Sequence, residues 1–407
     1  MKLRRAIGPL AVLVLVLVGA GIAACSGASS SASRHADAGS PGAISPLDIL
    51  RSGAAPGAAS DAGFARALSV RRFEFPQDFG PHPQYRHEWW YLTGHLASPQ
   101  GAQFGFELTF FRIALAPPTA SGSPERIAAG GASRSRWRTS QIYVAHFAIT
   151  DPQGKQFHST ARYARDALGL AGAQASPFRV WLEDWSLGER RSSGLWSLRA
   201  GDASYDLTLE LRALDAPVLN GDRGLSVKSD APGSASYYYS IPRVAARGRL
   251  SVAGRDVPVS GLAWLDREWG SGSLGPHEEG WDWFALQLAD GSALMFYNLR
   301  DDGGSRDAHS AGTWIAADGG TRALSSDAVR IDVEGDWRSP RGALYPARWR
   351  IRVPSLALDA RVIPVLADQE LDTTPRYWEG DVDVSGTRDG RTISGAGYVE
   401  LVGYDNR

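Results

Sequence analysis

The chain has 407 residues, a formal net charge of −1 and a single cysteine, Cys25. Because the charges nearly balance and no basic patch stands out, we do not expect nucleic acid to be a partner. A lone cysteine excludes an intrachain disulfide and a zinc site made of cysteines. The histidines also lack the close spacing of a zinc site, and the sequence contains no phosphate loop or dinucleotide fingerprint, so we expect no metal and no other cofactor.

The N-terminal segment has the pattern of a lipoprotein signal peptide. Three basic residues precede an apolar run that ends in Ile22-Ala23-Ala24-Cys25. This order is typical of a secretory signal, and a cysteine at the first mature position is typical of lipidation. We expect residues 1–24 to be removed and Cys25 to anchor the protein on the periplasmic or extracellular side of a bacterial membrane. The alternative is an uncleaved signal anchor in which Cys25 has no role.

Composition divides the rest of the chain into a tether and two domains. Residues 25–67 are rich in Ala, Gly, Ser and Pro, which predicts a flexible tether. The remaining part, about 340 residues, is longer than one ordinary hydrophobic core and predicts two domains. We place these domains at 68–245 and 246–407, with the boundary near residues 243–248.

Period-two alternation predicts β-strands through most of both domains. Clear examples are residues 103–111, 143–149, 205–211, 286–294 and 347–353. Turn residues recur about every 8–12 positions, and long amphipathic helix patterns are missing. The expected fold is all-β, with antiparallel strands in barrels or sandwiches.

Two segments of similar composition indicate two related β-domains. Glu88-Trp89-Trp90-Tyr91 leads through alternation to a turn and ends at Arg112. Gly280-Trp281-Asp282-Trp283-Phe284 leads through a turn to Arg300 in the same way. An internal repeat of this kind predicts that each half of the chain contains one such hairpin.

The first candidate site is Arg86-His87-Glu88-Trp89-Trp90. On a strand, Arg86, Glu88 and Trp90 point to the same side. This group predicts a site that holds the polar end of a ligand. The alternative is a structural ion pair that clamps the start of the strand.

The second candidate site is Trp264-Leu265-Asp266-Arg267-Glu268-Trp269. Alternation puts Trp264, Asp266 and Glu268 on one strand face, and carboxylates two residues apart lie within about 7 Å. Like charge among aromatic side chains raises the pKa of one carboxyl, so that it can donate a proton at neutral pH. The alternative is that both acids accept hydrogen bonds from loops or pair with arginine.

Two further aromatic runs are candidates. Tyr237 and Tyr239 share a strand face, where they either line a cavity or serve as β-formers at a sheet edge. The run Arg376-Tyr377-Trp378-Glu379-Gly380 again places aromatic residues beside an acid. We expect the ligand to be contacted by Arg86, Glu88, Trp90, His146, Trp283 and Trp378.

Together these segments resemble the AttH/carotenoid 1,2-hydratase (CrtC) superfamily, also called predicted secreted hydrolases. The resemblance covers about residues 70–404. It rests mainly on Glu88-Trp89-Trp90-Tyr91, Ala145-His146-Phe147, Ser236-Tyr237-Tyr238-Tyr239-Ser240, Trp264-Leu265-Asp266-Arg267-Glu268-Trp269, Gly280-Trp281-Asp282-Trp283-Phe284 and Tyr377-Trp378-Glu379-Gly380. It implies two tandem lipocalin-like antiparallel β-barrel domains.

The resemblance also implies roles for single residues. In the carotenoid hydratase branch an aspartate protonates a terminal alkene, and that aspartate matches Asp266. The aromatic residue two positions earlier matches Trp264. Tyr237 and Tyr239 stand where that branch has a His-x-Trp motif, so the acid is kept while its partners differ.

Two functions are consistent with these observations. The first is an envelope lipoprotein whose lipocalin-like cavity binds a hydrophobic small molecule, isoprenoid or lipid-like, as a transport accessory of an ABC-type export system. The second is a hydratase-like hydro-lyase, or a related isomerase or cyclase, in which Asp266 is the acid. In that enzyme Glu268 keeps Asp266 protonated, and Trp264, Tyr237, Tyr239 and Trp283 surround the reacting group. An enclosed cavity facing Asp266 favours the enzyme, whereas arginines bound to Asp266 and Glu268 favour the binder.

Overall fold

The computed structural model describes residues 62–118, 139–190, 194–272, 278–373 and 376–404. The expected signal peptide, Cys25 and most of the expected tether lie outside these ranges. Within them the chain forms strands and short 3₁₀ turns at Gln77–Phe79, Ser326–Ala328 and Pro354–Leu356. No helix in the described part is long and apolar enough to cross a membrane.

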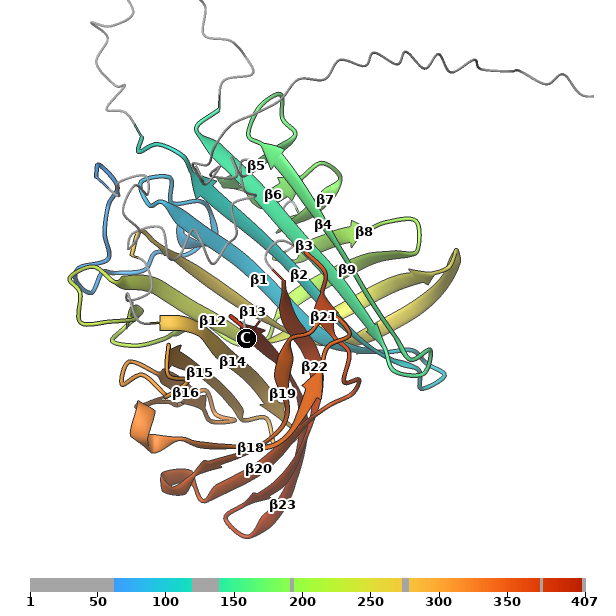
Figure 1. Ribbon diagram of the computed structural model, residues 1–407. Coiled ribbons are helices and arrows are strands. Elements are labelled where there is room, and N and C mark those ends of the chain that lie inside the picture. The colour runs from blue at the N-terminus through green and yellow to red at the C-terminus, as the bar shows by residue number, and fades with distance from the viewer. Residues whose placement is uncertain (1–61, 119–138, 191–193, 273–277, 374–375, 405–407) are drawn as a thin grey trace, which may run out of the picture. The chain divides into compact units, whose positions relative to one another are not determined.

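The described strands form two antiparallel sheets (Figure 1). The first sheet contains β1 (His87–Ala97), β2 (Gln103–Ala114), β3 (Gln141–Asp151), β4 (Gln156–Arg165), β5 (Ala171–Ala175), β6 (Phe178–Leu182), β7 (Trp185–Glu189), β8 (Trp196–Gly201), β9 (Tyr205–Ala213), β10 (Val218–Leu219), β11 (Leu225–Val227), β12 (Ala235–Val252) and β13 (Arg255–Gly270). The second contains β14 (Glu278–Leu288), β15 (Ala293–Asp301), β16 (Ala311–Ile315), β17 (Thr321–Leu324), β18 (Arg330–Arg338), β19 (Leu344–Val353), β20 (Leu358–Pro364), β21 (Glu370–Leu371), β22 (Tyr377–Arg388) and β23 (Arg391–Val402).

The two sheets share one winding pattern. The first has the order β4-β3-β2-β1-β13-β12-β9-β8-β7-β6-β5, and the second has the order β17-β16-β15-β14-β23-β22-β20-β19-β18. In each sheet the first strand lies between the second strand and the last. The first sheet forms a nearly closed barrel and the second a half-barrel, which confirms the all-β fold with two tandem barrel domains.

The hairpins named in the sequence are β1–β2 and β14–β15, one in each sheet. We expected residues 286–294 to form one strand. They instead contain the turn that joins β14 to β15.

The boundary between the two sheets lies later than the sequence suggested. Residues 243–248 fall inside β12, which pairs with β13 as far as Val252. β13 then pairs with β1 along its length and so completes the first sheet. The second sheet begins with β14 at Glu278. Alternation alone does not show which sheet a strand joins, and this is why the expected boundary was placed too early.

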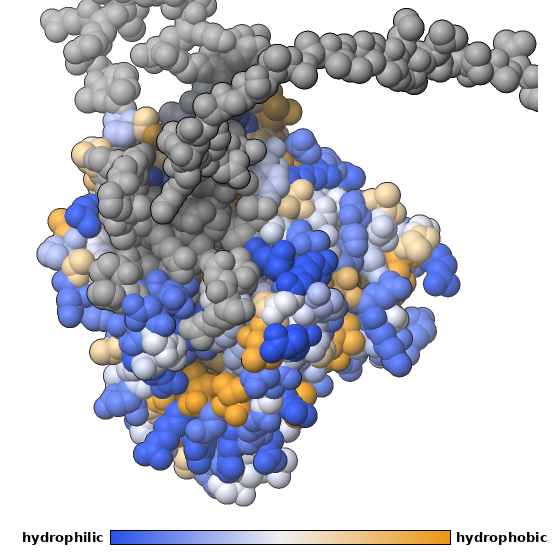
Figure 2. Space-filling view, viewed as in Figure 1, coloured by the Kyte–Doolittle hydropathy of each residue, from blue (hydrophilic) through white to orange (hydrophobic). Residues whose placement is uncertain are grey.

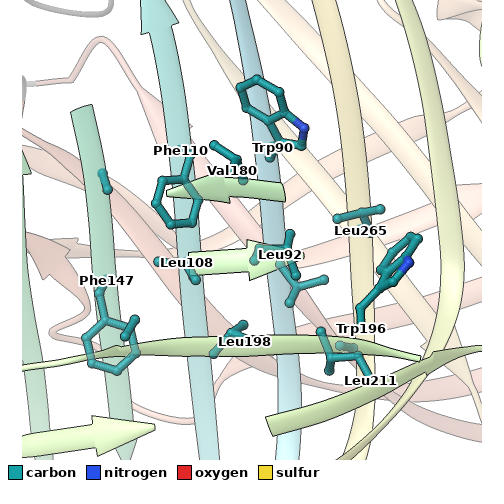
Figure 3. Packing of buried hydrophobic residues seen from close by; sticks show 14 of the residues in the cluster. Trp90, Leu92, Leu108, Phe110, Phe147, Val180, Trp196, Leu198, Leu211 and Leu265 are labelled. Atoms are coloured by element: carbon teal, nitrogen blue, oxygen red, sulfur yellow. The ribbon is translucent and has the colours of Figure 1, made fainter. Parts of the chain in front are cut away.

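Each sheet wraps around its own packed core. Figure 3 shows part of the first core, where side chains from β1, β2, β3, β6, β8, β9 and β13 meet. Trp90, Phe110 and Leu198 have exposed fractions of zero there. Large side chains of this kind each contribute roughly 1.5–3 kcal/mol when buried. The interior of the first barrel is therefore filled where a lipocalin-like ligand would be expected.

A third apolar layer lies between the two sheets. It contains Tyr91 and Trp264 from the first sheet and Trp283 and Tyr398 from the second. Successive side chains of a strand point to opposite faces, so Trp90 enters the first core while Tyr91 enters this layer. The outer face drawn in Figure 2 is largely hydrophilic, with small groups of apolar residues between charged ones.

Candidate active site

A cavity of about 130 Å³ lies in the layer between the two sheets. One water molecule needs only about 10–15 Å³ by the same kind of measure, so this space is much larger than a packing defect. Both sheets contribute walls, including Trp89, Asp266, Trp281, Trp283 and Glu400. Aromatic walls with a few convergent polar groups are typical of small-molecule sites.

Asp266 of β13 is held by three uncharged donors. The Ser240 hydroxyl donates to Oδ1 at 2.5 Å and the Trp264 indole donates to the same atom at 2.6 Å. The Tyr238 hydroxyl donates to Oδ2. Trp283 of the second sheet donates to the Tyr238 oxygen at 3.0 Å, so both sheets support the carboxyl.

Burial raises the pKa of Asp266 to about 7, and the nearby Glu268 carboxylate adds to the rise. The hydrogen bonds from Ser240, Tyr238 and Trp264 act in the opposite direction and limit it. Because these donors carry no charge, no full ion pair holds the carboxyl ionised. Asp266 is thus a buried acid that keeps its proton up to neutral pH.

Glu268 has different partners. Its carboxylate accepts from the Ser236 hydroxyl and lies 3.3 Å from Lys228 Nζ. Burial lowers the pKa of Lys228, but the charge and hydrogen bond of Glu268 together with Tyr297 and Glu278 outweigh burial, and the pKa is raised. Asp266 and Glu268 therefore face the cavity, and among the described residues neither is bound to arginine.

A second acid reaches the cavity from the other sheet. Glu400 of β23 lines the cavity, and its Oε2 accepts from the Trp281 indole at 3.1 Å. Burial raises the pKa of Glu400 to about 7, with Asp266 and Glu268 adding to the rise. The cavity thus contains two carboxyls, one from each sheet, that are both close to half-ionised at neutral pH.

Two more carboxyls lie behind Glu400. Glu379 stands opposite Glu400 on β22 and accepts from the Tyr91 hydroxyl, while Glu107 of β2 accepts from Thr109. Burial raises the pKa of both Glu379 and Glu107 well above the ordinary value. Burial therefore favours the protonated form of both groups.

Two buried histidines lie in the same layer. His87 lines the cavity, and burial lowers its pKa to about 3. His146 bonds through Nδ1 to the Tyr377 hydroxyl at 2.8 Å, and burial lowers its pKa to about 3 as well. Both are neutral at physiological pH. No group of three or more His, Cys, Asp or Glu side chains in the described ranges is arranged to hold a metal ion.

Glu88, which we expected to contact a ligand together with Arg86, has a structural role. The Glu88 carboxylate accepts from Arg112 and from Arg267, the latter at 2.8 Å. Burial opposes its ionisation, but the two arginines hold the pKa of Glu88 well below the ordinary value. Glu88 therefore ties β1, β2 and β13 together, which corresponds to the alternative of a structural clamp.

Tyr237 and Tyr239 lie away from Asp266. In the β12–β13 pairing Ser240 is opposite Asp266 and Tyr238 is opposite Glu268, so these four side chains share a face. Tyr237 and Tyr239 point to the other face, where their hydroxyls donate to the backbone oxygens of Ser69 and Asp78. The central tyrosine of the run, which we did not single out, is the one that reaches the acid.

Two expected ligand tryptophans also lie in cores. Trp90 packs in the first barrel under the Arg267 guanidinium, 3.8 Å from its ring centre. Trp378 packs in the second core and donates to the Ala367 backbone oxygen at 2.9 Å. Trp283 lines the cavity as expected, and His146 lies just behind its wall.

Several groups at the site have no strong signal in the sequence, namely Lys228, Tyr238, Ser240, Trp281, Tyr297 and Glu400. Trp281 and Tyr238 belong to runs already identified as aromatic motifs, and strand parity would have placed them. Lys228 and Glu400 lie in unremarkable sequence. Only the pairing of strands far apart in the chain brings them to Asp266.

A family model matches residues 66–404 and is described as AttH-like. The chain belongs to the AttH-like family. One crystal structure from this family, assigned to AttH of Nitrosomonas europaea, is 36% identical and has a TM-score of 0.73. It covers 84% of this chain and 100% of its own.

Two more distant proteins are similar to this AttH-like chain, one in structure and one in sequence. The crystal structure of kievitone hydratase from Nectria haematococca is 14% identical with a TM-score of 0.62, over 83% of this chain and 95% of its own, and shows a shared fold. Dehydratase asqC of Emericella nidulans is 24% identical over 212 residues, 49% of this chain. The match spans only 58% of that dehydratase.

Proposed function

We propose that the protein is a hydro-lyase that adds water to, or removes it from, a hydrophobic small molecule in the cavity between the sheets. The observation that carries this proposal is Asp266, a buried carboxyl that faces the cavity and holds its proton up to about pH 7. A ligand carrier needs no such acid. The names dehydratase and hydratase, carried by two distant relatives, support the same reaction class.

Asp266 and Glu400 act as the acid and the base of hydration. The carboxylate of Glu400 takes a proton from a water molecule, whose oxygen forms a bond to one carbon of the double bond. Asp266 gives its proton to the other carbon. At the end Asp266 is ionised and Glu400 is protonated, and exchange with solvent restores both. Dehydration is the reverse sequence, and a pKa near the working pH suits both groups to acid and base roles.

Hydrogen bonds within the site prepare Asp266 for this step. Trp264 and Ser240 hold Oδ1, so Oδ2, which Tyr238 contacts, is the oxygen that can carry the proton. The faces of Trp281 and Trp283 position an apolar substrate and keep bulk water away from the acid.

The test is a mass-spectrometric assay in water enriched in ¹⁸O, with a panel of aryl enones and prenylated phenols. Turnover adds one labelled water to the substrate. Asp266→Asn preserves the shape but removes the donor, and we expect at least a 100-fold loss of turnover with ligand binding retained. Asp256→Asn, an exposed acid on the same strand, is the matched control. Turnover that survives in Asp266→Asn contradicts the proposal.

The location of the protein is a separate proposal. We propose that Cys25 carries a lipid and holds the protein at the bacterial envelope, on the strength of the motif alone. Cys25→Ser should release the protein from the membrane fraction, and unchanged partitioning would contradict the anchor. Partnership with an ABC-type exporter stays a prediction from the sequence.

A further inference from the structure

Lys228 is an unusual residue in this chain. The sequence contains only three lysines, Lys2, Lys155 and Lys228, among many arginines. Lys228 lies directly after β11 and lines the cavity. A lysine ammonium is a compact charge with three N–H donors, so its position beside a buried acid calls for a chemical explanation.

The surroundings fix the Lys228 ammonium in place. Nζ lies 3.3 Å from Glu268 Oε1 and 4.0 Å from the ring centre of Tyr297. It also lies 5.4 Å from the ring centre of Tyr238, whose hydroxyl donates to Asp266. Glu268 occupies one donor direction, and the two rings stabilise the charge by cation–π contact. Donor capacity therefore remains for a ligand in the cavity.

A fixed positive charge limits the chemistry of the neighbouring acid. If Asp266 protonated an isolated alkene, a carbocation would form close to the ammonium, and the two like charges would repel each other, with only part of this repulsion offset by the Glu268 carboxylate. If negative charge develops instead, the same ammonium stabilises it. The position of Lys228 therefore favours a reaction in which an oxygen atom gains charge.

We propose that the substrate carries a carbonyl-type oxygen conjugated to the reacting double bond, and that Lys228 binds this oxygen. The inference rests on the proposed hydro-lyase function and names its substrate class. Lys228 then acts as the residue that distinguishes a conjugated carbonyl compound from a plain alkene of the same shape.

The reaction balances with groups already in the cavity. Glu400 takes a proton from water as the water oxygen bonds to the β-carbon. The π electrons of the double bond move through the α-carbon onto the carbonyl oxygen, and the resulting enolate bonds to Lys228. The enolate returns its electrons as the α-carbon takes the proton of Asp266. The product is a β-hydroxy carbonyl compound, and the reverse sequence removes water from it.

Three probes of nearly equal shape test this inference by calorimetric binding to the full chain. Benzylideneacetone carries a ketone oxygen, trans-cinnamate a carboxylate, and trans-β-methylstyrene no oxygen. We expect the wild-type protein to bind one or both oxygen-bearing probes at least about tenfold more tightly than the hydrocarbon, the effect of one charged hydrogen bond. The two oxygen-bearing probes distinguish a ketone substrate from a carboxylate.

The decisive variant is the double substitution Lys228→Met with Glu268→Gln, because it removes the ion pair without leaving a lone buried charge. Its fold is checked by circular dichroism and melting temperature. We expect its preference for the oxygen-bearing probes to fall to within about twofold. Lys155→Met, which removes an exposed lysine in the turn between β3 and β4, should keep the preference.

Several outcomes would overturn the inference. These are a double variant that folds and keeps the preference, a wild type that binds the hydrocarbon as tightly, and a wild type that binds none of the probes. Asp266→Asn should keep the preference, since it leaves Lys228 in place. If the protein shows no turnover in the labelled-water assay but still prefers the oxygen-bearing probes, the oxygen-binding site is real and the proposed reaction is wrong.

Discussion

Two opposing effects act on the Asp266 carboxyl. Burial and the neighbouring Glu268 charge raise its pKa, whereas three hydrogen bonds lower it, and the result is a value of about 7. Lysine and aspartate thus face the same cavity in different states. Lys228 forms an ion pair with Glu268, whereas Asp266 lies among uncharged donors and holds its proton up to about pH 7.

The raised pKa predicts a pH dependence of stability. Between pH 3.8, the ordinary value, and about 7, the unfolded chain releases the Asp266 proton while the folded chain keeps it. This contribution to the free energy of unfolding is therefore full below 3.8 and is lost as pH rises through about 7. Asp266→Asn does not titrate and so does not show this loss. Its free energy of unfolding, relative to that of the wild type, should therefore rise by roughly 2–4 kcal/mol between acid and neutral pH.

Urea unfolding of both proteins across this pH range measures the difference. The exposed Asp256→Asn serves as the control for removing one acid. A constant difference between wild type and Asp266→Asn at all pH values would show that Asp266 titrates as an ordinary aspartate.

Single residues differed in how far the sequence could place them. Asp266 and Trp264 were identifiable because both stand in one short run, where strand alternation fixes their relative sides. Tyr238 was missed in favour of Tyr237 and Tyr239, because the choice depends on which residue of β12 lies opposite Asp266. That register depends on the whole sheet and cannot be read from the residues next to Tyr238.

At the level of strands, Glu88 links β1 to β2 and β13. Its partners Arg112 and Arg267 are as deeply buried as the carboxylate itself. Removing one member of a buried ion cluster leaves the others uncompensated, which typically costs about 3–5 kcal/mol. We therefore expect Glu88→Gln to lower the free energy of unfolding by this amount.

Denaturant unfolding tests the prediction, with Glu334→Gln as the matched control. Glu334 pairs with Arg361 at 3.2 Å on the surface, where such pairs contribute at most about 1 kcal/mol. Equal effects of the two substitutions would mean that the Glu88 cluster does not clamp the first sheet.

The strands themselves followed well from the sequence. Residues 103–111, 143–149, 205–211 and 347–353 lie within β2, β3, β9 and β19. Local alternation was sufficient because each of these strands turns one face toward a core. The error at residues 286–294 arose where apolar residues continue on both sides of a tight turn.

In the molecule as a whole, the two sheets meet through a layer that contains several buried acids with raised pKa values. Glu107, Glu379 and Glu400 come from three strands, and burial raises the pKa of each. Such groups favour folding below their ordinary pKa of 4.5, and the contribution is lost as pH rises through the higher folded values. The contact between the sheets should therefore weaken toward alkaline pH.

Glu379→Gln should reduce this alkaline loss, because an amide keeps a polar group beside Tyr91 without a charge to bury. The midpoint of urea unfolding, followed from neutral to alkaline pH, measures the effect. Parallel curves for wild type and Glu379→Gln would contradict the assignment, and the exposed Glu334→Gln supplies the comparison for loss of one acid.

The arrangement of the two sheets was the part that the sequence could not supply. The motifs and the internal repeat predicted two barrel domains, and a ligand was expected inside a barrel. Large side chains fill that interior, while strands from both sheets leave space between them. The position of the cavity depends on how the outer faces meet, and neither domain contains that information alone.

The proposed reaction depends above all on whether Asp266 holds a proton near neutral pH in this cavity. Carbon-13 NMR of protein labelled at aspartate side chains measures it directly, with the Asp266 signal assigned by its absence in Asp266→Asn. We expect the Asp266 signal to titrate with a midpoint of about 7. A midpoint close to the ordinary value of 3.8 would contradict it, since Asp266 would then be ionised and unable to serve as the acid.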